Sequence, residues 1–277
     1  MDVFAAFIAP ALAGVFVGVM SGLLGVGGGT IMVPIFRLAF GMSPLASTAT
    51  SLFAIIPTSI SGVVAHTRAK TCVPKLGLAL GVGGAVMSPM GVWLASVSPG
   101  WLVICVAAIV IGFSAFKMFK KAVKCAPAPR AGRAGGISQD ASAKAVPDQP
   151  VLSRKQYLQG ACIGLIAGLA SGYVGVGGGF IMVPLMLAVL DIPMSLASGT
   201  SLIAIMILAI PGVIEQGLLG NIEYLAGIAI VVGSIPGALV GARLVRVVPE
   251  RQLRFIFGGF LLVAAVMLML NEFGILG

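Results

Sequence analysis

The feature of this sequence that most restricts its fold is a glycine-rich break that occurs twice inside apolar sequence. The segment SGLLGVGGGTIMVP covers residues 21–34, and SGYVGVGGGFIMVP covers residues 171–184, 150 positions later. Glycine accepts a positive φ and lets another backbone approach closely, as a turn between buried helices requires. We therefore expect two related halves, each containing one interrupted helix.

The composition indicates that these helices lie in a membrane. Apolar residues make up 59% of the 277 residues and charged residues 9%, whereas about a quarter of a soluble domain is charged. An all-α polytopic membrane protein is therefore expected, with most runs near the ~20 residues that cross a bilayer as a helix. The runs at 30–42 and 180–192 are short and fit partial spans or re-entrant arms. The apolar runs are 4–24, 30–42, 46–65, 75–96, 101–118, 156–174, 180–192, 196–215, 223–243 and 253–271.

Positive charge is concentrated between the two halves. Nine of the 17 Lys and Arg residues lie in the range 117–155, in a stretch rich in Pro, Ala, Gly and Ser. We interpret residues 121–152 as a disordered basic linker between a first membrane repeat, residues 1–120, and a second, residues 153–277. Excess Lys and Arg marks cytoplasmic segments, which places the linker in the cytoplasm. No aromatic residue lies among the basic residues of 120–155, so we expect contact with anionic membrane lipid and no nucleic-acid partner.

The loops of the two halves carry opposite charge patterns. Residues 66–75 include three basic residues, while their counterpart at 215–223 is acidic with no Lys or Arg. Residues 96–101 are uncharged, while 243–254 contains four arginines. If each loop follows the positive-inside rule, the halves have inverted topology. Each half then needs a glycine-broken re-entrant or hairpin element plus three transmembrane helices, as in many secondary transporters.

The glycine breaks are candidate anion sites. Non-helical backbone at membrane depth must line a cavity or be buried in protein, and free N–H groups where a helix starts attract anions. Proline is favoured in the first turn of a helix, so a short helix is expected to begin at Pro34 and Pro184 or slightly before them. The predicted substrate-binding residues of the two breaks are Gly27, Gly28, Gly29, Thr30, Gly177, Gly178 and Gly179.

Clusters of hydroxyl residues follow each break at the same offset. ASTATSL covers residues 46–52 and ASGTSL covers residues 197–202. Hydroxyl groups can donate hydrogen bonds to an anion without burial of a charge, and their alternative roles are helix capping and interhelical packing. Isolated glycines are expected to serve close helix packing instead, for example Gly18, Gly112 and Gly168. The predicted substrate-binding hydroxyl residues are Thr48, Thr50, Ser51, Ser198, Thr200 and Ser201.

The remaining charged, histidine and cysteine residues argue against a metal site, a cofactor and an enzyme. Arg37 and Arg243 are candidates for a vestibule that attracts anions, and His66 is expected at the membrane interface without a special role. The four cysteines are scattered with no CxxC pair, so we expect no metal and no cofactor. With one histidine and no nucleophile–base pair, an enzyme is not expected. No buried carboxylate identifies a coupling ion, which stays a possible partner.

The glycine segments, the two hydroxyl clusters and the basic central loop resemble the sulfite exporter TauE/SafE family, permeases of sulfur-containing anions in bacterial inner membranes. The resemblance covers nearly the whole chain outside residues 121–152. It implies anion permeation across the bacterial inner membrane and fixes neither the ion nor the direction. We expect a secondary transporter that exports a small sulfur oxyanion, sulfite first, or an organosulfonate. An anion channel and a carrier for another small metabolite or cation are the alternatives. Cys105 and Cys162 have no cysteine counterpart at the 150-residue offset, so a site of amides and hydroxyls fits better than a cysteine relay.

Overall fold

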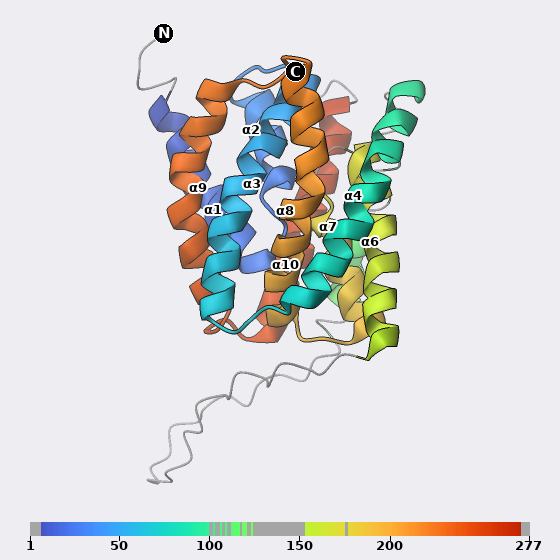
Figure 1. Cartoon of the computed structure of the whole chain (residues 1–277). Coiled ribbons are helices and arrows are strands. Elements are labelled where there is room, and N and C mark those ends of the chain that lie inside the picture. Colours follow the sequence, from blue (N-terminus) through green and yellow to red (C-terminus); the bar gives the residue numbers. More distant parts are fainter. Residues whose placement is uncertain are drawn as a thin grey trace, which may run out of the picture.

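A computed structural model describes residues 7–99, 153–174 and 177–272, together with residues 102, 106, 109, 112–116, 118–120 and 123. Helices joined by short connections account for these residues, and no strand occurs among them. Figure 1 shows the helices side by side in one bundle. Apart from position 123, the linker expected over residues 121–152 lies outside the described residues.

The helices follow the apolar runs of the sequence closely. The helix after each glycine break begins at the third glycine of GGG, five residues before the proline, which is the earlier of the two expected starts. The first half contains α1 (Ala9–Leu24), α2 (Gly29–Leu38), α3 (Pro44–Arg68) and α4 (Pro74–Val97). The second half contains α6 (Arg154–Val174), α7 (Gly179–Leu185), the π-helix η2 (Met186–Leu190), α8 (Met194–Leu218), α9 (Tyr224–Leu244) and α10 (Glu250–Glu272).

Four helices of the described residues are long and apolar enough to cross a membrane. They are Leu45–Arg68, Pro74–Leu94, Met194–Leu218 and Tyr224–Leu244. Two shorter apolar helices, Ala9–Leu24 and Gly179–Leu190, fall below the spanning length. The expected all-α polytopic membrane protein is therefore confirmed.

Each half packs its first helix against the other half. The most extensive helix contacts join α1 to α9 and α6 to α4. A Cβ atom added at Gly18 would lie 2.2 Å from the carbonyl oxygen of Ser234, and one at Gly168 would lie 2.2 Å from that of Gly84. The packing role predicted for these two glycines is confirmed, since only glycine permits such backbone approach. At Gly112 no atom of the described residues lies within 4 Å of an added Cβ, so a packing role there stays a prediction.

Helices α3 and α8 form the centre of the bundle and run antiparallel. Gly62, late in α3, packs on Leu202, early in α8, and Gly212 packs on Leu52 in the same way. Both partners of the second contact are shifted from those of the first by 150 residues. In Figure 1 the pair lies between α1–α9 and α4–α6.

The connections between helices also make pairs of contacts at equivalent positions of the two halves. The Val73 amide donates to the Thr200 hydroxyl oxygen at 3.0 Å, and the Glu223 amide donates to the Thr50 hydroxyl oxygen at 3.0 Å. These two bonds are again related by the 150-residue offset. Because α3 and α8 are antiparallel, the α3–α4 and α8–α9 connections lie at opposite ends of the bundle, as Figure 1 shows.

Candidate functional site

The first glycine break forms a tight turn between α1 and α2. Gly25 closes α1 with φ 71°, and its amide donates to the Ser21 carbonyl oxygen at 2.8 Å. Gly27 and Gly28 have φ values of 78° and 83°. Three left-handed residues in four positions reverse the chain, and a side chain at any of them would be strained. The whole turn is buried in protein.

The second break repeats this geometry and meets the first. Gly177 and Gly178 have φ values of 84° and 67°, and Gly178 is the residue before α7. A Cβ added at Gly179 would lie 2.8 Å from the Cα and from the carbonyl oxygen of Val26. Val26 is 2% exposed. The two breaks, 150 residues apart in sequence, are therefore in direct backbone contact inside the bundle.

Two isoleucines from the central helices cover the turns. Ile205 of α8 contacts Gly27, at 2.8 Å from the position of an added Cβ, and also Gly179, at 2.6 Å. Ile55 of α3 contacts Gly177 at 3.1 Å. Both isoleucines are fully buried, and their positions differ by 150 residues. Each central helix therefore places one branched apolar side chain on the turn of the opposite half, which sequence reasoning did not find.

The backbone of the first turn offers hydrogen-bond donors. The amides of Ile31 and Met32 both donate to the Gly28 carbonyl oxygen, at 3.0 and 2.9 Å. The first helical residues, Gly29 and Thr30, have no carbonyl one turn earlier in the helix to which they can donate. The positive end of the α2 dipole points at the same place. An anion that reached the turn would therefore meet free amides and a favourable field.

Two buried hydroxyl groups flank this turn without a hydrogen-bond partner among the described residues. They belong to Ser21, which is 1% exposed, and Thr30, which is 3% exposed. The Ser21 Cβ lies 3.7 Å from the position of a Cβ on Gly28. Thr30 was predicted to line the site, whereas Ser21 was not, because a lone serine in an apolar helix resembles a packing residue. A buried unpaired hydroxyl costs about 1–3 kcal/mol, so its presence favours a polar ligand.

The hydroxyl clusters of α3 and α8 make bonds within the protein. The Ser201 hydroxyl donates to the Gly25 carbonyl oxygen at 2.6 Å and so ties α8 to the first turn. The Ser51 hydroxyl donates to the carbonyl oxygen of Thr48 at 2.9 Å. Thr50 and Thr200 accept from the connections of the opposite half, as described above. Of these predicted residues, Ser201 is the one that a recorded hydrogen bond joins to a glycine turn, and substrate binding by the others stays a prediction.

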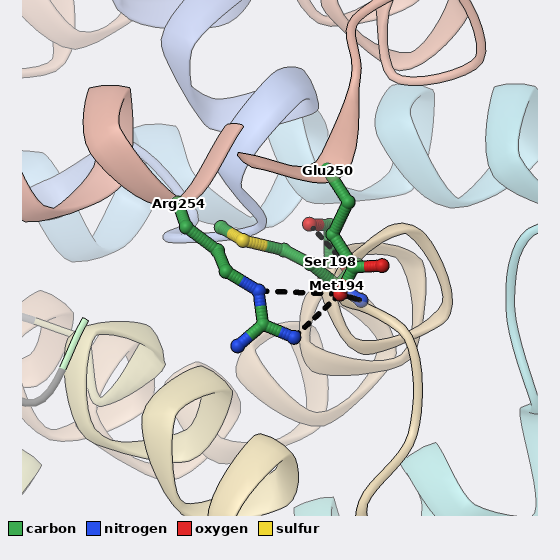
Figure 2. Close-up of polar contacts among 4 residues, drawn as sticks. All are labelled: Met194, Ser198, Glu250 and Arg254. Atoms are coloured by element: carbon green, nitrogen blue, oxygen red, sulfur yellow. Dashed lines mark hydrogen bonds and ion pairs between the residues drawn. The ribbon is translucent and has the colours of Figure 1, made fainter. Parts of the chain in front are cut away.

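Ser198 lies one turn after the start of α8, where α8 meets α10. Its hydroxyl donates to the Met194 carbonyl oxygen at 2.9 Å. The Met194 amide in turn donates to Glu250 Oε1 at 3.4 Å, and Glu250 forms an ion pair with Arg254 at 2.5 Å (Figure 2). A carboxylate at a helix N-terminus stabilises the helix, so this group fixes the start of α8. A Cβ on Gly25 would also lie 2.4 Å from the Ser198 carbonyl oxygen.

The charged candidates lie away from the turns in sequence, at helix ends. Arg37 is half-buried in the last turn of α2, and Arg243 is exposed in the last turn of α9. Whether either residue attracts anions stays a prediction. No group of three or more His, Cys, Asp and Glu residues that could hold a metal ion occurs in the part of the chain that the structure describes.

The expectation for His66 is wrong. The ring is fully buried, with Nε2 2.9 Å from the Gly22 carbonyl oxygen and Nδ1 2.8 Å from the Thr71 hydroxyl oxygen. A carbonyl oxygen only accepts, so Nε2 donates and Nδ1 accepts the Thr71 proton. The histidine therefore fastens the end of α1, just before the first turn, to the connection after α3. Its single occurrence next to basic residues made an interfacial position the simpler interpretation.

A polytopic helical bundle in which two broken helices meet at a buried centre has the architecture of a membrane transporter. Residues 10–268 match the family model described as "Sulfite exporter TauE/SafE", and the chain belongs to this family. The resemblance to this family that the glycine segments indicated is therefore confirmed.

Curated relatives agree with this class. The chain is 29% identical over 238 residues to "Probable membrane transporter protein YdhB" of Bacillus subtilis, covering 86% of this chain and 89% of the relative. It is 26% identical over 248 residues to "Probable membrane transporter protein YunE" of the same organism, covering 87% and 89%. No solved structure matches this chain.

Proposed function

We propose that this protein is a secondary transporter that exports a small sulfur oxyanion, sulfite first, or an organosulfonate. The observation that carries the proposal is the backbone contact between Val26 and Gly179, which brings two amide-rich turns together in the buried centre. The family description supports a sulfur anion as the substrate. The process is permeation without a chemical step.

In this proposal the substrate binds beside the first turn. The amides of Gly28 and Gly29 donate to the anion oxygens, and the unpartnered hydroxyls of Ser21 and Thr30 complete the shell. Amide and hydroxyl donors suit an oxyanion because they supply partial positive charge without an ion pair that would hold the substrate too tightly. The corresponding turn supplies the amides of Gly177 and Gly178 from the opposite side, since the Gly179 amide itself donates to the Gly177 carbonyl oxygen at 2.8 Å.

The covering isoleucines provide the gates. Ile205 lies on Gly27 and Gly179, and Ile55 lies on Gly177, so the turns are covered from both central helices. A small displacement of α3 or α8 uncovers one side at a time. Because Ile205 lies on both turns and Ile55 on the second, one relative motion of the two helices changes the cover of both turns together. This is alternating access around a fixed site.

The reciprocal contacts support an inverted repeat across the membrane. The connection after α3 contains Lys70 and is flanked by Arg68 and Lys75, whereas the equivalent connection after α8 contains Glu223 and no Lys or Arg, and the two connections lie at opposite ends of the bundle. The Arg246 guanidinium donates to the Ala69 carbonyl oxygen, so the two basic connections, 69–73 and 245–249, share one end. By the positive-inside rule this end and the linker face the cytoplasm of a bacterium, with the protein in its inner membrane.

The proposal is tested by anion efflux from proteoliposomes that contain the purified protein. Liposomes loaded with sulfite, sulfate, sulfoacetate or taurine are diluted into anion-free buffer, and release is measured with time. Sulfite or sulfoacetate is expected to leave faster than the passive rate. If neither does and another solute does, the assigned substrate class is wrong.

Variants of the two turns test the site itself. Gly28→Val and Gly178→Val add side chains at positive φ, where the added Cβ would lie 2.9 Å from Val17 and 3.0 Å from Leu208. Both are expected to abolish efflux while leaving membrane insertion intact. Gly41→Val is the matched control, because Gly41 also has a positive φ, 62°, but no atom within 4 Å of an added Cβ. Near-normal efflux in both turn variants would remove the turns from the mechanism.

A further inference from the structure

An apolar groove opens on the outside of the bundle where α1, α2 and α10 meet. It has a volume of about 620 Å³, and its lining includes Phe16, Pro34, Ile35, Phe255, Gly259 and Val263. Its outer lip is exposed, since Phe16 is 59% exposed and Val263 57%. A volume of this size is in the range of small-molecule sites in proteins, about 300–1,000 Å³.

The inner wall of the groove is the start of α2. Thr30 lines the groove and is itself 3% exposed, with a hydroxyl that has no partner among the described residues. Pro34, which also lines the groove, has no N–H and cannot donate to the Thr30 carbonyl oxygen one turn earlier. Whatever occupies the groove therefore lies against the helix that begins at the first glycine turn.

A cation lies at one end of the groove. Arg251 is one turn before Phe255 on α10, and its guanidinium carbon lies 5.7 Å from the centre of the Phe255 ring. The Arg251 Nε is buried without a hydrogen-bond partner among the described residues. The neighbouring Arg254 differs, because Glu250 neutralises it (Figure 2). The end of the groove therefore carries a positive charge for which the described residues record no carboxylate partner.

The dimensions match one leaflet of a bilayer. Phe255 and Val263 are eight residues apart on α10, about 12 Å along a helix, and Arg251 lies about 6 Å further at 1.5 Å per residue. Half of the hydrocarbon core of a bilayer is about 15 Å. An apolar groove of this length, with a cation at one end, is complementary to a lipid acyl chain followed by an anionic headgroup.

We propose that the groove binds an anionic phospholipid, with one acyl chain between α1, α2 and α10 and the phosphate at Arg251. The residue equivalent to Arg251 in the first half is Trp101, so the repeat does not duplicate the charge. The lipid belongs to the leaflet on the side of the basic connections. Its chain contacts Pro34 and Thr30 and so reaches the helix of the first turn. This proposal goes beyond the proposed function, with Thr30 as the one residue that the groove shares with the proposed substrate shell.

Native mass spectrometry of the full chain in detergent tests the proposal. The protein is incubated with equal amounts of phosphatidylglycerol and phosphatidylcholine that carry the same acyl chains. Retention of phosphatidylglycerol is expected to exceed that of phosphatidylcholine about fivefold, the factor for one cation–lipid contact of ~1 kcal/mol. Arg251→Gln is expected to make the two equal, and Lys75→Gln, which removes an exposed cation elsewhere, is expected to leave the preference unchanged.

A second pair of variants tests the groove. Gly259→Leu fills it, and no atom lies within 4 Å of an added Cβ there, so the variant is expected to fold with an unchanged thermal midpoint. It is expected to lose the retained lipid. Gly112→Leu is the control, because Gly112 is equally unobstructed and lies outside the groove.

Three results would overturn the proposal. They are equal retention of the two lipids by the unmodified protein, an unchanged preference in Arg251→Gln, and full retention in Gly259→Leu. A dimer that Gly259→Leu abolishes would likewise overturn it, since the groove would then hold a second copy of the chain.

Discussion

A single methyl group at the meeting point of the two turns tests the centre of the structure. In Gly179→Ala the added Cβ would lie 2.8 Å from both the Cα and the carbonyl oxygen of Val26. That is 0.6 Å closer than the 3.4 Å at which ordinary contact begins. Unlike Gly177 and Gly178, Gly179 has no positive φ, so the variant introduces steric overlap without backbone strain.

The free-energy cost of Gly179→Ala depends on which groups next to the added methyl group can move away from it. The Ile205 side chain, 2.6 Å from the added atom, can rotate, but the Val26 backbone is buried and cannot. Overpacking of this kind costs about 1–3 kcal/mol. If the turns must meet in every transport cycle, this energy lowers the efflux rate roughly 5- to 160-fold, at tenfold per 1.36 kcal/mol.

The assay is sulfite efflux from proteoliposomes, normalised to inserted protein, together with the midpoint of thermal unfolding in detergent. Gly217→Ala is the control, because the nearest atoms to its added Cβ lie at 3.7 Å, an ordinary contact. A Gly179→Ala protein with the efflux rate and midpoint of the unmodified chain would refute the argued contact between the turns.

Three other expectations follow from the described contacts. Ser201→Ala removes the bond to the Gly25 carbonyl oxygen and is expected to lower stability by about 1–3 kcal/mol, measured by thermal unfolding, with Ser201→Thr as the conservative comparison; an unchanged midpoint would contradict it. His66→Phe removes both ring hydrogen bonds and leaves the buried Gly22 carbonyl oxygen without its recorded partner, while the Thr71 hydroxyl keeps its bond to the backbone of residue 66, so its unfolding midpoint is expected to fall at least as far as that of Ser201→Ala, and a smaller fall would count against the proposed fastening role. Single cysteines at Lys70 and Leu219, in a background with the native cysteines replaced by serine, are expected to react with an impermeant thiol reagent from opposite sides of the membrane; labelling of both from one side would exclude the inverted repeat.

The helices were predictable from the sequence because long apolar runs with few charged residues identify membrane-spanning helices. The apolar run 196–215 became Met194–Leu218, and the short run 180–192 became Gly179–Leu190. Gly and Pro interrupt these runs where the backbone turns. The 150-residue offset also predicted which positions would be equivalent, and contacts such as Gly62–Leu202 and Gly212–Leu52 follow that offset.

The side-chain contacts of the site were harder to predict from the sequence than the helices. Ile55 and Ile205 cover the turns, but an isoleucine in an apolar helix has the same appearance whether it faces lipid or a glycine. The hydroxyls of Thr50 and Thr200 bond to the connections of opposite halves, which depends on tertiary geometry rather than on spacing. His66 was misjudged for the same reason, since its partner Gly22 is 44 residues away.

The crossed packing of α1 on α9 and of α6 on α4 has a consequence for biosynthesis. α1 ends at Leu24 and its partner begins at Tyr224, so α1 is synthesised well before the helix that covers it. A fragment ending at the linker would hold glycine-lined faces with nothing to cover them and would be a substrate for quality-control proteases. The two fragments made together in one cell would assemble, because each carries the surface that the other lacks.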